Sequence, residues 1–162
     1  MLEIERKYLV KKIPNNLSSY KSNYIRQGYI SPSPSPLRIR QKGDKFELTK
    51  KLPIKDGDFN SAEEINIYLT EYEFGKLWPL VEKSLEKMRY DIPINGGLTA
   101  ELDVFKGGLE GLVLVEVEFV SEEQMQQFQP PEWFGKDVTQ ESYSANVFLA
   151  GKTYNDVKMY VE

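Results

Sequence analysis

The chain has 162 residues, of which 40% are hydrophobic and 28% charged, and its formal net charge is −4 at pH 7. This composition is typical of a folded globular protein and excludes a disordered chain. It predicts one domain over residues 1–162 whose surface should not attract nucleic acid. The sequence has neither cysteine nor histidine, which excludes thiolate chemistry and histidine bases, so any metal must be held by oxygen atoms.

No apolar run approaches the roughly 20 residues of a membrane-spanning helix. The N-terminal segment MLEIERK has acids where a signal peptide has its apolar region. We therefore expect a cytoplasmic protein with no membrane partner, and the absence of cysteine agrees with that expectation. The composition leaves the oligomeric state open between a monomer and a homodimer.

The first half of the chain predicts a series of antiparallel strands. Alternation over residues 1–10 places Glu3, Glu5 and Lys7 on one face of the first strand. Residues 11–23 are polar and predict a loop. The repeat SPSPSP over residues 31–36 predicts an exposed connector, because proline cannot donate a backbone hydrogen bond. Further strands are expected over residues 24–30, 37–41, 45–52 and 62–70, with a loop over residues 53–60.

The second half mixes helices and strands. Apolar residues at three- and four-residue spacing predict an amphipathic helix over Glu71–Met88, which Pro79 should kink or split. Strands are expected over residues 87–92, 99–105 and 112–120, and helices over residues 121–129 and 141–149. Residues 130–139 are expected to form a loop.

Several of these strands have one apolar face and one charged face. The acids fall in alternating pairs at Glu3 and Glu5, Glu101 and Asp103, and Glu116 and Glu118. Six bases accompany them, namely the alternating pairs Arg38 and Arg40, and Lys87 and Arg89, and the single residues Lys7 and Lys51. The residues alone allow a sheet with a charged solvent face or a barrel with a charged interior. In a barrel, the bases would match a ligand with several negative charges, such as a polyphosphate, and the acids would hold Mg²⁺ or Mn²⁺.

Short motifs follow one another along almost the whole chain: ExExK at Glu3–Lys7, QGY at Gln27–Tyr29, RxR at Arg38–Arg40, LTKK at Leu48–Lys51, KxR at Lys87–Arg89, ELDVF at Glu101–Phe105, GLVLVEVEF at Gly111–Phe119 and WFGKDVT at Trp133–Thr139. This ordered set resembles the CYTH family, the triphosphate tunnel metalloenzymes, and within it the short bacterial inorganic triphosphatases. The resemblance implies an eight-stranded antiparallel closed β-barrel with flanking helices, dominated by β-structure and α+β by content. Its interior would be a tunnel that binds triphosphate and a divalent metal.

The resemblance also implies roles for individual residues. The phosphates would be bound by the bases Lys7, Arg38, Arg40, Lys51, Lys87 and Arg89. Mg²⁺ or Mn²⁺ would be bound by the acids Glu3, Glu5, Glu116 and Glu118, with Asp103 as a helper. The catalytic residues would be Lys7, Tyr29, Lys51 and Glu64, with Tyr29 pairing with Lys51.

One stretch departs from the family pattern. Members of the family usually carry a basic residue and two alternating acids on the strand after the LTxK hairpin, where this chain has Asn60, Ala62 and Glu64. This departure leaves open the number of metal ions and the group that positions the attacking water.

The resemblance predicts a divalent-metal-dependent triphosphatase that hydrolyses inorganic tripolyphosphate to pyrophosphate and phosphate. Its partner would be a small-molecule triphosphate. The same tunnel could serve a thiamine triphosphatase or a nucleoside triphosphatase, which remain alternatives. A polyphosphate-binding module without catalysis is an alternative of another class, and the acid missing at Ala62 supports it.

Overall fold

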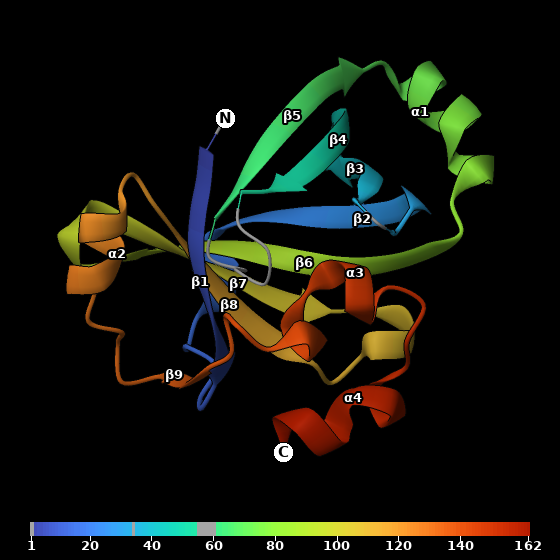
Figure 1. The fold of residues 1–162 in the computed structure, drawn as a ribbon. Helices are drawn as coiled ribbons and strands as arrows, with labels where there is room; N and C mark the ends of the chain where they lie inside the picture. The colour runs from blue at the N-terminus through green and yellow to red at the C-terminus, as the bar shows by residue number, and fades with distance from the viewer. Residues whose placement is uncertain (1, 34, 55–60) are drawn as a thin grey trace.

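A closed β-barrel forms the centre of the molecule (Figure 1). The computed structural model describes residues 2–33, 35–54 and 61–162. One sheet has the strand order β5-β4-β3-β2-β6-β7-β8-β1-β9, and pairing of β5 with β1 closes eight of its strands into the expected antiparallel barrel. The strands are β1 (Leu2–Val10), β2 (Lys21–Ser31), β3 (Leu37–Lys42), β4 (Lys45–Pro53), β5 (Ser61–Leu69), β6 (Lys83–Ile94), β7 (Leu98–Phe105), β8 (Val113–Phe119) and β9 (Phe134–Asp137).

The first strand is the place where the barrel closes. One edge of β1 pairs with β8 from Ile4 to Leu9. Its other edge pairs with β5 only from Leu2 to Ile4, and with β9 at Tyr8 and Val10.

The outer wall of the barrel beside β1 and β8 is apolar and covered. Ile4 and Tyr8 alternate with the charged residues of β1 and pack with Val115 and Val117 of β8. Phe128 and Phe134, from the segment that follows β8, lie over them. Because side chains alternate across a strand, Glu5, Lys7 and Glu116 then face the interior. The arrangement with a charged interior, expected from the resemblance, is the one that the structure adopts.

One end of the barrel interior is filled by apolar side chains. Leu85, Phe105 and Leu114 share the inner faces of their strands with Lys87, Asp103 and Glu116 and pack into one cluster. Residues of the C-terminal segment complete this cluster, namely Leu149, Ala150 and Val157. The charged layer therefore lies directly beside a closed apolar end.

The helices are short and lie around the barrel (Figure 1). They are α1 (Glu71–Leu77), α2 (Glu122–Gln127), α3 (Asn146–Leu149) and α4 (Tyr154–Val161), with 3-10 turns at residues 17–19, 78–80, 95–97, 107–109 and 142–144. In the described ranges, no helix is both long and apolar enough to cross a membrane.

The predicted helix over Glu71–Met88 is wrong beyond its first two turns. Thr70 caps α1 through a capping box with Glu73, as its sequence suggests. The α-helix ends at Leu77, because Pro79 lacks a backbone N–H and stands inside the following 3-10 turn. Strand β6 then begins at Lys83, so Leu85 and Met88 belong to a strand and their helical spacing is coincidental.

Other boundaries also differ from expectation. Strand β2 begins at Lys21, inside the expected loop over residues 11–23, and β9 lies inside the expected loop over residues 130–139. The expected helix over residues 141–149 is a 3-10 turn followed by the single turn of α3, and α4 was not anticipated. Pro34 of the predicted connector over residues 31–36 and residues 55–60 of the predicted loop over residues 53–60 lie outside the described residues. Asn60, one of the residues that depart from the family pattern, is among them.

Candidate functional site

A cavity of about 320 Å³ lies inside the barrel, within the size range of small-molecule sites. Five of the predicted site residues line it: Glu5, Lys7, Tyr29, Arg38 and Lys51. The rest of its lining is mostly apolar and comes from the loop ends and the C-terminal segment, including Pro32, Pro36, Pro53, Ala62, Ala145 and Val147, together with Asn146. A charged wall and a partly apolar wall therefore enclose the same space.

A second cavity of about 330 Å³ lies outside the barrel, beside Arg26, Trp78 and Lys106. None of the predicted site residues is among the described residues that line it. The inner cavity is therefore the candidate site.

Lys7 lies at the junction between this cavity and the buried charges. It stands opposite Glu116 in the β1–β8 register, and its ammonium lies 3.0 Å from the Glu116 carboxylate. Burial by itself disfavours the charged ammonium, but the carboxylates of Glu116 and Glu5 outweigh burial and raise the pKa of Lys7. Lys7 is thus a fixed positive charge at any physiological pH.

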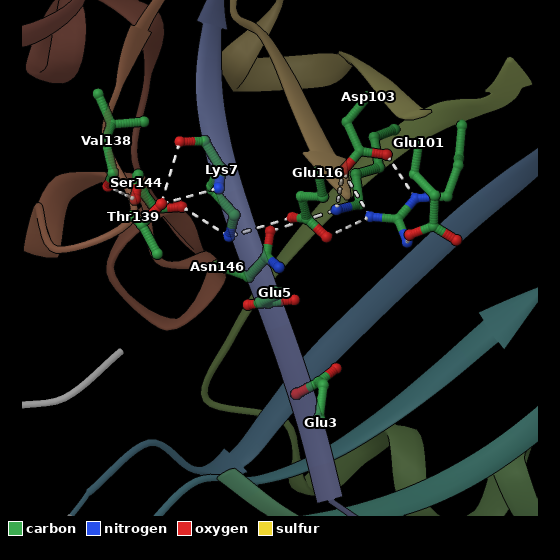
Figure 2. A network of polar contacts seen from close by, with 12 residues as sticks. Glu3, Glu5, Lys7, Glu101, Asp103, Glu116, Val138, Thr139, Ser144 and Asn146 are labelled. Atoms are coloured by element: carbon green, nitrogen blue, oxygen red, sulfur yellow. Dashed lines mark hydrogen bonds and ion pairs between the residues drawn. The ribbon is translucent and has the colours of Figure 1, made fainter. Parts of the chain in front are cut away.

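Behind Lys7, a network of ion pairs spans β6, β7 and β8 (Figure 2). The Arg89 guanidinium donates two hydrogen bonds of 2.7 Å to Asp103, one of 2.9 Å to Glu116, and one to Glu101. The Lys87 ammonium lies 2.6 Å from the same Asp103 carboxylate. Asp103 is fully buried, so the two cations compensate its charge, and the shared carboxylate holds both bases in place.

Arg38 is a buried base with an unused donor. Its guanidinium lies 3.7 Å from the Glu64 carboxylate of β5. Among the described residues, none accepts a hydrogen bond from its Nε, although that atom is buried. Burial opposes the charge, but the groups around the guanidinium, Tyr29 first and then Glu64, raise the pKa of Arg38. A buried guanidinium with a free donor beside a cavity favours an anionic ligand there.

Lys51 also lines the cavity, next to Glu3 and Glu5 of β1. Its ammonium is 2.6 Å from Glu3 and 3.8 Å from Glu5. Tyr29 lines the same cavity, and its hydroxyl accepts a hydrogen bond of 3.1 Å from Gln27. The structure thus places Tyr29 and Lys51 at one site, while the ammonium of Lys51 forms ion pairs with acids of β1.

Arg40 lies farther along β3 and pairs with an acid that the sequence analysis did not select. Its Nε donates to Glu47 of β4 at 2.7 Å. Burial and the neighbouring charge of Arg38 lower the pKa of Arg40. Alternation did place Glu47 on the same face of its strand as Lys51, which was the available signal for this residue.

The acids of β1 and β8 have the ligand type that Mg²⁺ and Mn²⁺ prefer. Glu5 and Glu118 stand directly opposite each other in the register. Burial and neighbouring carboxylates raise the pKa of both residues, and that of Glu118 to about 7. Such a pair of like charges is unfavourable unless a cation lies between them.

These acids do not form a complete metal site by themselves. Within the described part of the chain, no three acidic side chains come close enough together to hold a metal ion. Glu116 and Asp103 are already paired with Lys7, Lys87 and Arg89. Glu3, Glu5 and Glu118 match a divalent cation in ligand type and charge but do not by themselves form a three-ligand site, so the substrate would supply the remaining oxygens.

Comparison with known proteins agrees with this geometry. The family model of the CYTH domain matches residues 1–145. The chain is 43% identical over 154 residues to the inorganic triphosphatase of Nitrosomonas europaea, covering 93% of this chain and 97% of that protein. It is 31% identical over 171 residues to the inorganic triphosphatase of Acetivibrio thermocellus, with 96% and 97% covered.

The solved structures point the same way. The chain matches a crystal structure of an inorganic triphosphatase with a TM-score of 0.67 and 39% identity, over 91% of this chain and 93% of that one. The family match extends over most of the chain, and the strands and charged interior lie where the motifs predict them. This chain belongs to the CYTH domain family.

Proposed function

We propose that this protein is a divalent-metal-dependent inorganic triphosphatase, which hydrolyses tripolyphosphate to pyrophosphate and phosphate. The observation that carries the proposal is Arg38, a buried guanidinium with an unused donor beside a cavity that Lys7 and Lys51 also line. Three bases around a small closed-ended cavity fit a compact polyanion. The similarity to two inorganic triphosphatases supports the choice of tripolyphosphate.

In this proposal, the bases bind the non-bridging oxygens of the substrate. Arg38 offers a planar pair of donors, while Lys7 and Lys51 act as point charges. As water attacks a terminal phosphorus, the bridging P–O bond breaks, and negative charge grows on the pyrophosphate that leaves. The fixed cations stabilise that charge without having to reorganise.

The remaining predicted residues have supporting roles in the proposal. Glu64 orients Arg38, and Tyr29 borders the substrate beside it. Arg40, Lys87 and Arg89 extend the positive field of the site, with Lys87 and Arg89 held by Asp103. The residues that would hold Mg²⁺ or Mn²⁺ are Glu3, Glu5 and Glu118, next to Glu116. The bound ion would neutralise phosphate charge and lower the pKa of water.

A second candidate function rests on the apolar part of the lining. Pro32, Pro36 and Pro53 offer a surface on which an organic group could pack, as in a thiamine or nucleoside triphosphate. A triphosphatase with such a substrate would use the same bases. The relative rates on tripolyphosphate, thiamine triphosphate and ATP at equal concentration distinguish the two functions.

The test is a turnover assay on the purified chain with Mg²⁺ or Mn²⁺. We expect tripolyphosphate to yield pyrophosphate and phosphate in equal amounts, resolved by ion chromatography. Absence of phosphate release from every triphosphate would contradict the proposal. Tight binding by calorimetry without release would then identify a polyphosphate-binding module.

We also propose the cytoplasm as the compartment of this enzyme, because a sequence without cysteine suits a reducing compartment. Fractionation of cells that express the tagged chain would test this location.

A further inference from the structure

The segment over residues 138–146 continues along β1 from the short strand β9. The Val138 N–H donates to the Lys7 carbonyl at 2.8 Å, and the Lys7 N–H donates to the Thr139 hydroxyl at 3.0 Å. The Thr139 backbone in turn donates to Asp137 at 2.9 Å. This segment is therefore fixed to the strand that carries Glu5 and Lys7.

The same segment holds two lysines from different strands. The ammonium of Lys7 donates to the Ser144 carbonyl at 3.3 Å. The ammonium of Lys87 donates to the Asn146 side-chain oxygen Oδ1, also at 3.3 Å. Ser144 is itself buried, and its hydroxyl donates to the Val138 carbonyl at 2.8 Å. Asn146 is thus positioned by its own contact with Lys87 and by the contacts of Ser144, two residues earlier, with Lys7 and Val138.

The contact with Lys87 decides which way the amide of Asn146 points. A lysine ammonium has donors only, so it must meet the oxygen and not the nitrogen of the amide. The two N–H groups of Nδ2 are then left over. Among the described residues, none accepts a hydrogen bond from Nδ2, and Asn146 lines the inner cavity together with Glu5 and Lys7 (Figure 2).

We propose that Asn146 is a further phosphate-binding residue of this site, whose Nδ2 donates to a non-bridging oxygen of tripolyphosphate beside Lys7. This inference rests on the proposed function. A neutral amide adds a directed hydrogen bond to a site in which Lys7 and Lys51 supply charge without fixed direction. Lys87 acts here through Asn146, as the group that orients the amide.

The test measures binding separately from turnover. Its probe is a tripolyphosphate whose two bridging oxygens are replaced by CH₂ groups, which blocks hydrolysis, and Mg²⁺ is present. We expect Asn146→Ala to weaken calorimetric binding about 10- to 100-fold, the loss typical of one hydrogen bond to a charged group. Asn155→Ala, at an exposed asparagine of α4, is the matched control and should bind within about twofold.

A second variant distinguishes direct contact from an effect through Lys87. Asn146→Asp keeps an oxygen for Lys87 but places a negative charge where the amide donor stood. We expect it to bind the probe even more weakly than Asn146→Ala. If Asn146→Asp binds as tightly as the unchanged chain, or if Asn146→Ala does, the inference is overturned.

A third measurement uses only the unchanged chain, so its result does not depend on whether a variant folds. In the unchanged ¹⁵N-labelled chain, the side-chain amide signal of Asn146 should shift when the probe binds, and an unmoved signal would overturn the inference. If the unchanged chain binds the probe but releases no phosphate from tripolyphosphate, the proposed function fails. The binding comparison at Asn146 still decides the inference in that case.

Discussion

Lys7 and Glu116 face each other across the β1–β8 register and form a buried ion pair of 3.0 Å. Lys7 also lines the inner cavity, while Glu116 also accepts from Arg89. This one pair therefore connects the cavity with the buried network of β6 and β7. Its two members stabilise each other's charged form: the pKa of Glu116 falls well below its usual range and that of Lys7 rises.

Replacing Glu116 should destabilise the fold. Glu116→Gln leaves the ammonium of Lys7 and part of the Arg89 guanidinium buried without a counter-charge. Removing one partner of such a pair typically costs about 3–5 kcal/mol in the free energy of unfolding. Urea denaturation at pH 7 measures this loss. Glu110→Gln is the control, since Glu110 is exposed and its replacement should change the unfolding free energy little; equal losses in the two variants would contradict the role of Glu116.

Lys51 should affect substrate binding more than folding, because it is only partly buried at the cavity wall. We expect Lys51→Ala to raise KM for tripolyphosphate about 10- to 100-fold, the loss of one charge-assisted contact. Steady-state phosphate release measures the effect. Lys45→Ala removes the same charge from an exposed position of β4 and should leave KM nearly unchanged. A KM that is the same in Lys51→Ala as in the unchanged chain would remove Lys51 from the phosphate site.

Chelation should abolish turnover, and added Mg²⁺ or Mn²⁺ should restore it. Glu5→Gln removes one of the two carboxylates that stand opposite each other in β1 and β8. Replacing a residue that only hydrogen-bonds to a metal ligand already lowers metal affinity by about 10- to 100-fold. For Glu5, which would bind the metal directly, we therefore expect at least a tenfold rise in the Mg²⁺ concentration that gives the half-maximal rate. Glu82→Gln, at an exposed site, should need no additional Mg²⁺. Full activity with a chelator present would contradict metal dependence.

Asp137 should make stability depend on acid pH. Burial opposes its charge, but hydrogen bonds from Thr139 and the contact with Arg6 lower the pKa of Asp137 below its usual value near 4. A lowered folded-state pKa adds stability above the unfolded-state value, and this stability is lost as the pH falls through the folded-state value.

In Asp137→Asn, we therefore expect a smaller unfolding free energy at pH 7 and a shallower loss of stability below pH 4. Because Asp137 is about one-third exposed, solvent screening keeps the effect small. Urea denaturation at a series of pH values measures it. Identical pH profiles for the two chains would show that the contacts of Asp137 with Thr139 and Arg6 contribute nothing to folding.

The alternation of charged and apolar residues in the sequence was enough to predict which side chains share a face of each strand. It placed Glu3, Glu5 and Lys7 on one face of β1 and Glu116 and Glu118 on one face of β8, because side chains in a strand alternate with a period of two. It could not decide whether that face points to solvent or to an interior, since both arrangements satisfy the same local pattern. The ordered motifs predicted the interior, and the structure agrees.

Local pattern failed where tertiary contacts decide the secondary structure. The residues from Lys83 to Met88 have helical spacing, but they form β6 because both edges of that strand are paired in the closed sheet. Strand β9 is four residues long and exists through its pairing with β1. Short segments of this kind gain their stability from neighbours that are distant in the sequence.

The partners of the charged residues were decided by the tertiary structure alone. Sequence spacing grouped acids with acids and bases with bases, whereas the folded chain pairs Lys7 with Glu116, Arg89 with Asp103 and Lys51 with Glu3. These pairs form across strands, so they depend on register and closure of the barrel. The same is true of Asn146, which reaches the site because its segment runs along β1 after β9, a place that no periodicity in the sequence predicts.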